Sequence, residues 1–243
     1  MMRRVLLILS LVLACSRLTW AAVAFDACTT VSYEGATSVT WADHAAGGSN
    51  RVALGQIANT PSTSISSVTW GGSAMTSVVT QVEATYDLRA SIYRYVAPST
   101  SGQAMVATFA AATYGAGGAC SYTGVDQTTP ITSSNGADGD SDTASVVITS
   151  ATDELVADVV SFYENVGFPN QVPGTNQTER FEVSDSFGDG SAASTEAGAA
   201  SVTMSWALNL PLADQHWAQV GAALKASSGT VATPKRLLTL GAG

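Results

Sequence analysis

The chain has 243 residues, of which 46% are hydrophobic and 12% are charged, and its formal net charge is −9 at pH 7. The apolar content is enough to build a sizeable core, which excludes a generally disordered chain. The acidic balance argues against nucleic-acid binding, because a negatively charged surface repels phosphate groups.

In chain order, the first expected element is a secretory signal peptide over residues 1–24. Arg3 and Arg4 form its basic start, residues 5–14 form its apolar run, and "AVA" at 22–24 offers small residues for cleavage. About ten apolar residues are too few to cross a hydrocarbon layer of roughly 30 Å, so we expect no retained membrane helix. The leader predicts a secreted protein, either extracellular or held at the cell surface.

The role of the cysteines depends on how this leader is processed. Residues 12–15 ("VLAC") resemble a bacterial lipoprotein box, and in that alternative Cys15 carries a lipid anchor. If the whole leader is removed, Cys28 and Cys120 remain, and an even number of cysteines in an exported chain suggests a disulfide. Two free buried thiols are the alternative to a Cys28–Cys120 bridge.

Short segments with apolar and polar residues in alternation recur along residues 25–226, which we expect to form one domain. The expected strands are 37–41, 51–57, 67–70, 75–83, 88–96, 105–109, 119–123, 145–149, 154–162, 178–183, 200–208 and 217–224. About ten to twelve strands without a helical period predict an all-β fold, an antiparallel two-sheet sandwich of the jelly-roll kind.

The connections between these strands carry turn residues. Gly71-Gly72 predicts a tight hairpin after residues 67–70, and an Ala- and Gly-rich loop is expected after residue 109. The Gly-, Ser- and Thr-rich segments 133–144 and 187–200 are expected to be surface loops.

Residues 227–243 read as a linker followed by a short basic and apolar tail, "KRLLTLGAG". Its apolar residues Leu237, Leu238 and Leu240 would suit addition to the open sheet edge of a neighbouring molecule, as in donor-strand assembly. A frayed terminus is the alternative reading.

Four segments, in this order, resemble a group of bacterial and phage-associated exported proteins without an assigned activity. They are "SSVTWGGSAMT" (66–76), "SIYRYVAP" (91–98), "SYTGVDQTTP" (121–130) and "STEAGAASVTMSW" (194–206). The resemblance implies a single β-sandwich in an extracellular, surface or virion protein, and it brings no catalytic residues. The chain departs from the group's usual pattern at Cys120, where an aliphatic residue is more typical.

Acidic residues suggest one place for a metal ion. The sequence "DGDSD" sets Asp138, Asp140 and Asp142 on alternate residues of a glycine-containing segment, and hard cations such as Ca²⁺ bind several carboxylate oxygens. The segment lacks the central glycine and distal glutamate of an EF-hand, so a solvated acidic turn is the alternative. Asp185 and Asp189 in "DSFGDG" form a second, poorer candidate.

Catalytic chemistry has little support in the sequence. His44 and His216 are the only histidines, and the chain lacks a G-x-S-x-G nucleophile turn, so we expect no Ser-His-acid triad. Asp153, Glu154 and Asp158 lie near one strand and could serve a glycan-active hydrolase, whose carboxylate separation is spatial. Charges that keep a strand end soluble are the alternative, and we expect no catalytic residues and no enzyme.

Exposed aromatic rings would suit stacking on sugars. Trp70, beside Gly71-Gly72, and Tyr86, in a loop, are the aromatic residues that we expect to be exposed, with core packing as the alternative. The sequence therefore predicts an exported surface protein with a structural or adhesive role. Its expected partners are further copies of itself, if it self-assembles, or a surface glycan. A carbohydrate-binding module is the first alternative and a glycan-active hydrolase the second, and Ca²⁺ is the one cofactor that the sequence offers.

Overall fold

The structure is a computed structural model that describes residues 22–163, 170–208 and 215–228. These residues form fifteen strands, and none of them forms a helix that is long and apolar enough to cross a membrane. The strands are β1 (Ala24–His44), β2 (Val52–Thr60), β3 (Ile65–Trp70), β4 (Ser73–Ala74), β5 (Thr76–Glu83), β6 (Leu88–Val96), β7 (Gln103–Thr123), β8 (Ile131–Gly139), β9 (Thr143–Ile148), β10 (Leu155–Tyr163), β11 (Val172–Pro173), β12 (Thr178–Ser184), β13 (Asp189–Ala197), β14 (Val202–Ala207) and β15 (Trp217–Leu224).

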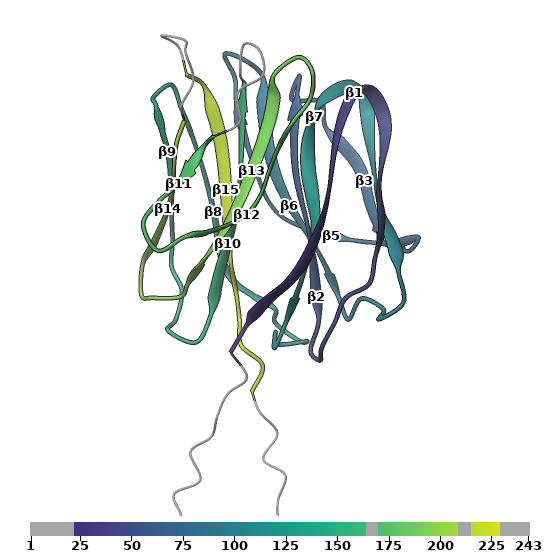
Figure 1. The fold of residues 1–243 in the computed structure, drawn as a ribbon, viewed down its shortest axis with the longest axis vertical. Helices are drawn as coiled ribbons and strands as arrows, with labels where there is room; N and C mark the ends of the chain where they lie inside the picture. The colour runs from purple at the N-terminus through teal and green to yellow at the C-terminus, as the bar shows by residue number, and fades with distance from the viewer. Residues whose placement is uncertain (1–21, 164–169, 209–214, 229–243) are drawn as a thin grey trace, which may run out of the picture.

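The strands pair into three antiparallel sheets, which Figure 1 shows as successive layers. The large sheet has the order β4-β3-β7-β2-β6-β5, with β1 also paired to β7, the central sheet β12-β13-β10-β15-β8, and the small sheet β11-β14-β9. The predicted all-β antiparallel sandwich is therefore confirmed. The prediction of only two sheets is wrong, because the small sheet covers the second face of the central one, and the jelly-roll strand order stays a prediction.

The central sheet is buried on both faces. In β10, Ala157 and Val159 pack toward the large sheet, whereas Val156 and Val160 pack toward the small one. Every residue of β15 is buried. This arrangement explains why the sequences of β10 and β15 are nearly continuous apolar runs, which are typical of strands in an inner layer.

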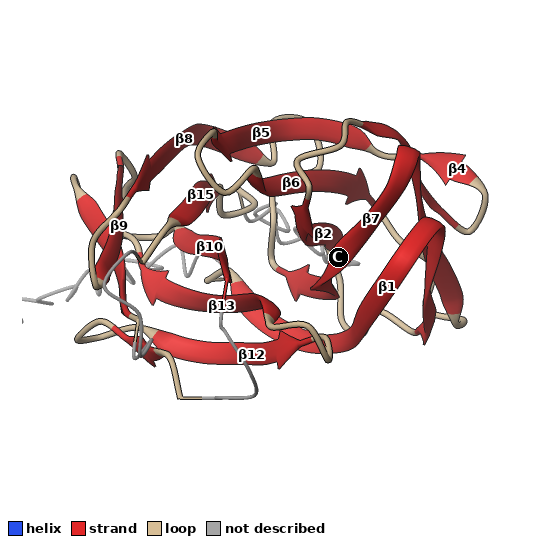
Figure 2. Cartoon of the chain, turned by 90° about the horizontal axis from the view of Figure 1, so that it is seen from above, coloured by secondary structure: helices blue, strands red, loops and turns tan. Residues whose placement is uncertain are grey.

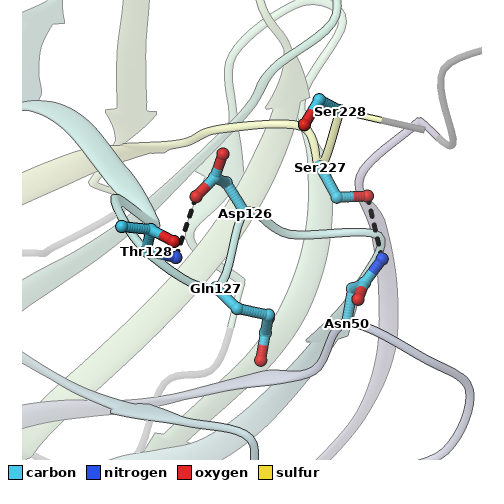
Figure 3. A pocket seen from close by; sticks show the side chains of 6 residues that line it. All are labelled: Asn50, Asp126, Gln127, Thr128, Ser227 and Ser228. Carbon is cyan, nitrogen blue, oxygen red and sulfur yellow. Dashed lines mark hydrogen bonds between the residues drawn. The ribbon is translucent and has the colours of Figure 1, made fainter. Parts of the chain in front are cut away.

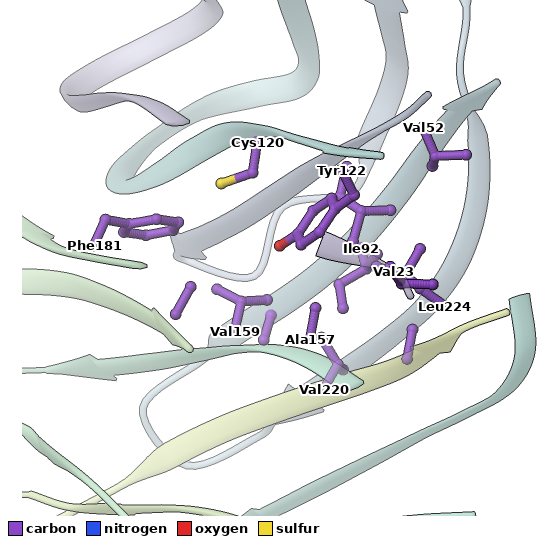
Figure 4. Close-up of a cluster of buried hydrophobic side chains, with 14 of the residues drawn as sticks. Val23, Val52, Ile92, Cys120, Tyr122, Ala157, Val159, Phe181, Val220 and Leu224 are labelled. Atoms are coloured by element: carbon purple, nitrogen blue, oxygen red, sulfur yellow. The ribbon is translucent and has the colours of Figure 1, made fainter. Parts of the chain in front are cut away.

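The main core lies between the large and central sheets, as Figure 4 shows. Tyr122 and Cys120 of β7 enter it from the large sheet, and Val159 and Val220 enter it from the central sheet. Val23 also packs there, although it falls within the predicted leader.

Strands β1 and β7 form one long ribbon that folds over on itself. Their pairing runs from Ala24 opposite Thr123 to His44 opposite Gln103, with register shifts near the bend. Gly35 and Gly115 lie at this bend with positive φ angles of 57° and 144°, and a Cβ on Gly115 would press on the backbone of β2. The expected loop after residue 109 is therefore wrong, because residues 110–118 continue β7 around the bend.

The fold divides the large sheet into two legs with a second core between them. The inner leg holds β2, β5, β6, the first half of β1 and the second half of β7. The outer leg holds β3, β4, the second half of β1 and the first half of β7. Trp41, Trp70 and Met105 of the outer leg pack on Ala53 and Ile57 of the inner leg. The predicted exposure of Trp70 is wrong: its side chain is 1% exposed because the outer leg turns it inward.

Two segments that were expected to be surface loops are largely strands. Residues 131–139 form β8, which pairs with β15, and residues 189–197 form β13, which pairs with β10. Their small side chains allow close packing rather than a turn, and a Cβ on Gly190, for example, would collide with the ring of Phe162.

Cys28 and Cys120 form a disulfide, as predicted. They are direct partners in the β1–β7 register, so the bridge joins the start of β1 to the end of β7 within the inner leg. Cys120 shares its side of the sheet with Tyr122, and both face the main core.

Both ends of the described chain leave the molecule at the same end, which we name the terminal end (Figure 1). An isolated bridge between Val125 and Ala226 joins the end of β7 to the last described residues there. The opposite, distal end carries the β5–β6 turn, the β12–β13 turn and the start of β15. Figure 2, which looks along the sandwich, shows β5 beside β8 and β1 near β12, so the two larger sheets adjoin at both edges.

Candidate functional site

An aromatic cluster lies at the distal end and contains Glu83, Tyr86, Tyr163 and His216, which we name the Tyr86 cluster. The rings of Tyr86 and His216 stack with centroids 4.4 Å apart, and Tyr163 lies 6.1 Å from Tyr86. Tyr86 is 38% exposed, as predicted from its place in a turn. Tyr86 is therefore a partly exposed ring that stacks on the ring of His216.

Glu83 holds this cluster together. Its carboxylate accepts hydrogen bonds from the backbone N–H groups of Thr85 and Tyr86, both at 2.8 Å, and lies 3.2 Å from Nδ1 of His216. Burial acts to raise the pKa of Glu83, but the N–H donors of Tyr86 and Thr85 and the nearby His216 outweigh it and lower that pKa. The carboxylate therefore stays charged at neutral pH and orients both the turn and the imidazole.

His44 is linked by hydrogen bonds to Ser121, and Ser121 to Asp26, which lies at the surface. The hydroxyl of Ser121 donates to Asp26 at 2.7 Å, so Nε2 of His44, also 2.7 Å away, must donate to the same hydroxyl. In a catalytic triad the histidine would instead accept the proton of the serine. Ser121 is fully buried and His44 is 4% exposed, so these bonds tie the two legs of the ribbon rather than presenting a nucleophile.

Asp158 is a fully buried carboxylate between the central and small sheets. Ser194 donates to one of its oxygens from N–H at 2.7 Å and from Oγ at 2.8 Å, and Trp206 Nε1 and Gln219 Nε2 donate to the other at 2.8 and 2.7 Å. Burial raises its pKa to about 6, although these donors act in the opposite direction. The residue organises the inside of the fold and does not face a substrate.

The three carboxylates considered for glycan hydrolysis therefore do not form a surface pair. Glu154 lies at the terminal end, where its carboxylate accepts hydrogen bonds from Thr132 Oγ1 and from the N–H of Ala151, both at 3.0 Å. Asp158 lies inside the fold, and Asp153 precedes β10 in the turn.

The acidic segment between β8 and β9 is exposed. Asp138 accepts a hydrogen bond from Gln81, and Asp142 accepts one from Thr143 at 3.2 Å. Within the described residues, no three His, Cys, Asp or Glu side chains gather at one place where they could hold a metal ion. Calcium binding by Asp138, Asp140 and Asp142 stays a prediction.

The segment "SYTGVDQTTP" borders a polar hollow of about 230 Å³ at the terminal end, shown in Figure 3. Asp126 Oδ1 accepts the N–H groups of Thr128 and Thr129, both at 2.9 Å, and thereby caps the turn. Asn50 Nδ2 donates to Ser227 Oγ at 3.0 Å across the hollow. These polar groups are used to join β7 to both the β1–β2 loop and the C-terminal segment.

Several predicted features lie outside the described residues. These are most of the leader, the lipoprotein alternative at Cys15, and the assembly tail with Leu237, Leu238 and Leu240. They stay predictions.

Comparison with family models, with curated proteins and with solved structures found no match to this chain. The resemblance on "SYTGVDQTTP" and its companion segments therefore stays a prediction. What the site can do has to be argued from its geometry.

Sequence reasoning missed the partners of Tyr86 and the role of Asp158. His216 lies 130 positions after Tyr86 in the chain, and no local pattern connects the two. Asp158 did carry a signal, because a single carboxylate inside the apolar run "LVADVVSF" has to be buried when both faces of the strand are covered.

Proposed function

We propose that this chain is an exported, non-catalytic surface protein with a structural or adhesive role, which is held at its terminal end and presents its distal end. The observation that carries the proposal is that both described chain ends emerge together at one end of the sandwich (Figure 1). The β5–β6 turn with Tyr86 lies at the other end, because the end of β2 pairs with the start of β6 there, whereas Asn50 before β2 bonds to Ser227. Such a layout suits a domain displayed outward from a cell or particle. The Cys28–Cys120 disulfide supports an oxidising, extracytoplasmic location.

The environment of the polar side chains supports a non-catalytic role. His44 and Ser121 bond to each other inside the large sheet, and His216 lies beneath the ring of Tyr86. Asp158 is surrounded by donors that belong to the fold. Each of these groups has a structural partner that accounts for its position.

The experiment uses antibodies on the native material. One antibody is mapped to the turn around Tyr86 at the distal end, and the other to the turn around Asp126 at the terminal end. We expect the first to label intact cells or particles under the electron microscope, and the second to label only after extraction. Labelling of neither site, of both equally, or of the Asp126 turn alone would contradict display by the terminal end.

Self-assembly through residues 235–243 is the finer form of this proposal. A variant that lacks these residues should remain monomeric in light scattering while it keeps the melting temperature of the full chain. A truncated protein that still polymerises would rule out the tail as the assembling segment.

Carbohydrate binding is a second candidate, and the exposed face of Tyr86 favours it. The exposed part of this ring is an apolar surface on which a sugar ring could stack, and the buried Glu83 holds the turn that presents it. Tyr86→Ala should abolish signals on a glycan array, while Phe187→Ala serves as the control, because Phe187 is a 56% exposed aromatic residue that packs on Tyr114 instead. Equal losses in both variants, or none, would contradict a sugar site at Tyr86.

A further inference from the structure

The turn between β12 and β13 is closed by Asp185. One of its oxygens, Oδ1, accepts the backbone N–H groups of Phe187 at 2.8 Å and of Asp189 at 3.0 Å. Its own N–H donates to the carbonyl of Asp189 at 3.1 Å. These bonds hold the turn through one carboxylate oxygen and leave the other oxygen, Oδ2, without a role in it.

Three buried oxygens in this region have no hydrogen-bond partner: Oδ2 of Asp185, Oδ1 of Asp189 and Oγ of Ser191. The residues are 8%, 6% and 0% exposed, respectively. Asp189 and Ser191 are two positions apart in β13, so they lie on one face, the face on which Ala193 packs toward the large sheet. Buried carboxylate oxygens without partners are costly, which points to a missing ligand.

The local charge supports the same conclusion. Asp185 and Asp189 face each other across the turn, where the main-chain N–H of Asp185 donates to the carbonyl of Asp189, and their residues are only 8% and 6% exposed. Two acidic side chains therefore lie close together and shielded from water. Neither carboxylate forms an ion pair with a Lys or Arg among the described residues.

We propose that Asp185 and Asp189, assisted by Ser191, bind a calcium ion where the β12–β13 turn meets the large sheet. All three donors are oxygens, which suit a hard cation, and a divalent ion balances two carboxylates. Calcium accepts irregular shells completed by water or carbonyl oxygens, whereas magnesium requires near-ideal octahedral geometry and loses its water reluctantly. The site goes beyond the proposed function and differs from the exposed Asp138 segment that the sequence ranked first.

Calcium would join two layers of the fold at the distal end. Asp189 also accepts a hydrogen bond from the side chain of Thr60, the last residue of β2. Its charge, with that of Asp185, raises the pKa of Tyr33 beyond the effect of burial, which places that ring near the pair. The ion therefore links the β12–β13 turn to the inner leg beside the ribbon's bend.

The test measures thermal unfolding of the full chain after treatment with a chelator and then with added CaCl₂ or MgCl₂. Extracellular modules bind calcium with Kd values of about 0.1–1 mM, so 10 mM calcium should raise Tm of the wild type by about 3–11 °C. Magnesium at the same concentration should have little effect. The double variant Asp185→Asn/Asp189→Asn should lose the calcium shift, and Asp138→Asn/Asp142→Asn should keep it.

Several results would overturn the proposal. They are a wild type that does not respond to calcium, an equal response to magnesium, a shift that persists in Asp185→Asn/Asp189→Asn, and a shift that is lost only in the Asp138 variant. If the double variant does not fold, calorimetric titration of each single variant replaces it, with an expected loss of at least tenfold in calcium affinity. Unchanged affinity in both single variants would also overturn the site.

Discussion

Gln219 offers the sharpest test of how the inside of this fold is held, because its amide donates to a carboxylate that cannot reach water. Gln219→Met keeps the length of the side chain and its burial but removes the Nε2–H···Oδ2 bond to Asp158, which measures 2.7 Å. The lost Oε1 of Gln219 has no partner, so its removal costs nothing further. Nε2 also donates to the carbonyl of Met204 at 3.3 Å, so the substitution removes one hydrogen bond to a buried charge and one longer hydrogen bond to a neutral carbonyl.

The magnitude follows from the charge of the acceptor. Hydrogen bonds to charged groups contribute about 1.5–3 kcal/mol, so Gln219→Met should lower the free energy of unfolding at pH 7.5 by that amount. The donor stabilises the charged form of Asp158, whose pKa in the fold is about 6 and is therefore raised above its ordinary 3.8. Because the pKa is raised in the fold, the free energy of unfolding falls as pH rises from about 4 through about 6. Loss of a donor to the carboxylate raises this pKa further, so the variant loses more stability over the same rise in pH. The cost should therefore shrink when the pH is lowered to 5.

The assay is urea unfolding at pH 7.5 and pH 5, with Gln81→Met as the matched control. Gln81 also donates to an aspartate, but its partner Asp138 is exposed, so its loss should change stability by less than about 0.5 kcal/mol. In an Asp158→Asn background, Gln219→Met should cost about 1 kcal/mol or less. A variant as stable as wild type at pH 7.5, or a cost that is the same at both pH values, would refute the reasoning.

Three further predictions concern stability. Replacing both Cys28 and Cys120 with Ala should lower the free energy of unfolding by up to roughly 4–5 kcal/mol, because the bridge spans 92 positions, and urea unfolding with and without reductant checks this. In the presence of a chelator, the free energy of unfolding of the wild type should fall between pH 5 and pH 7, because the pKa of Asp189 is raised in the fold. Asp189→Asn should show a smaller fall with pH and a higher stability at pH 7, and a larger fall would contradict this. Gly117→Ala should cost about 1–3 kcal/mol, because its Cβ meets the backbone carbonyl of Gln56, and it should cost more than Gly221→Ala, whose Cβ meets the flexible Ile148 side chain at 2.9 Å; equal melting temperatures would count against this packing.

Local patterns predicted the individual strands well. The alternation in "SVTMSW" places Val202, Met204 and Trp206 inward, and all three are buried in β14. The Gly71-Gly72 hairpin also forms, with Trp70 opposite Ser73. These features depend on neighbouring residues alone, which is why sequence reasoning reached them.

The arrangement of layers was not predictable from the same patterns. Small residues are typical of loops, but in β13 they allow close contact between sheets, since Gly190 lies against Phe162. Trp70 precedes a turn, yet it is buried because a ribbon built from distant parts of the chain folds over it. Composition does not distinguish flexibility from close packing, and burial on a second face depends on partners far away in sequence.

Among the candidate sites, too, one was predictable from the sequence alone and the others depend on contacts between distant segments. Pairing of Cys28 with Cys120 followed from counting the cysteines that remain if the predicted leader is removed, and the structure has that bridge. The stack of Tyr86 on His216 and the unpartnered oxygens of Asp185 and Asp189 depend on loops brought together only by the finished fold. Sequence reasoning found the residues of the second pair but had no measure of their burial.

The folded ribbon also has a consequence for the order of assembly. Among the described strands, β1 pairs with β7 alone, so β1 has no sheet partner until residues 103–123 have been made, and its first residue pairs with the last of them. Contacts over such separations form slowly, because closing a long loop is entropically unfavourable. Before then, the apolar residues of β1 lack the strand that covers them in the native fold. Once β7 is in place, the disulfide secures only the inner leg, so the outer leg depends on the packing of the second core and on the bond between His44 and Ser121.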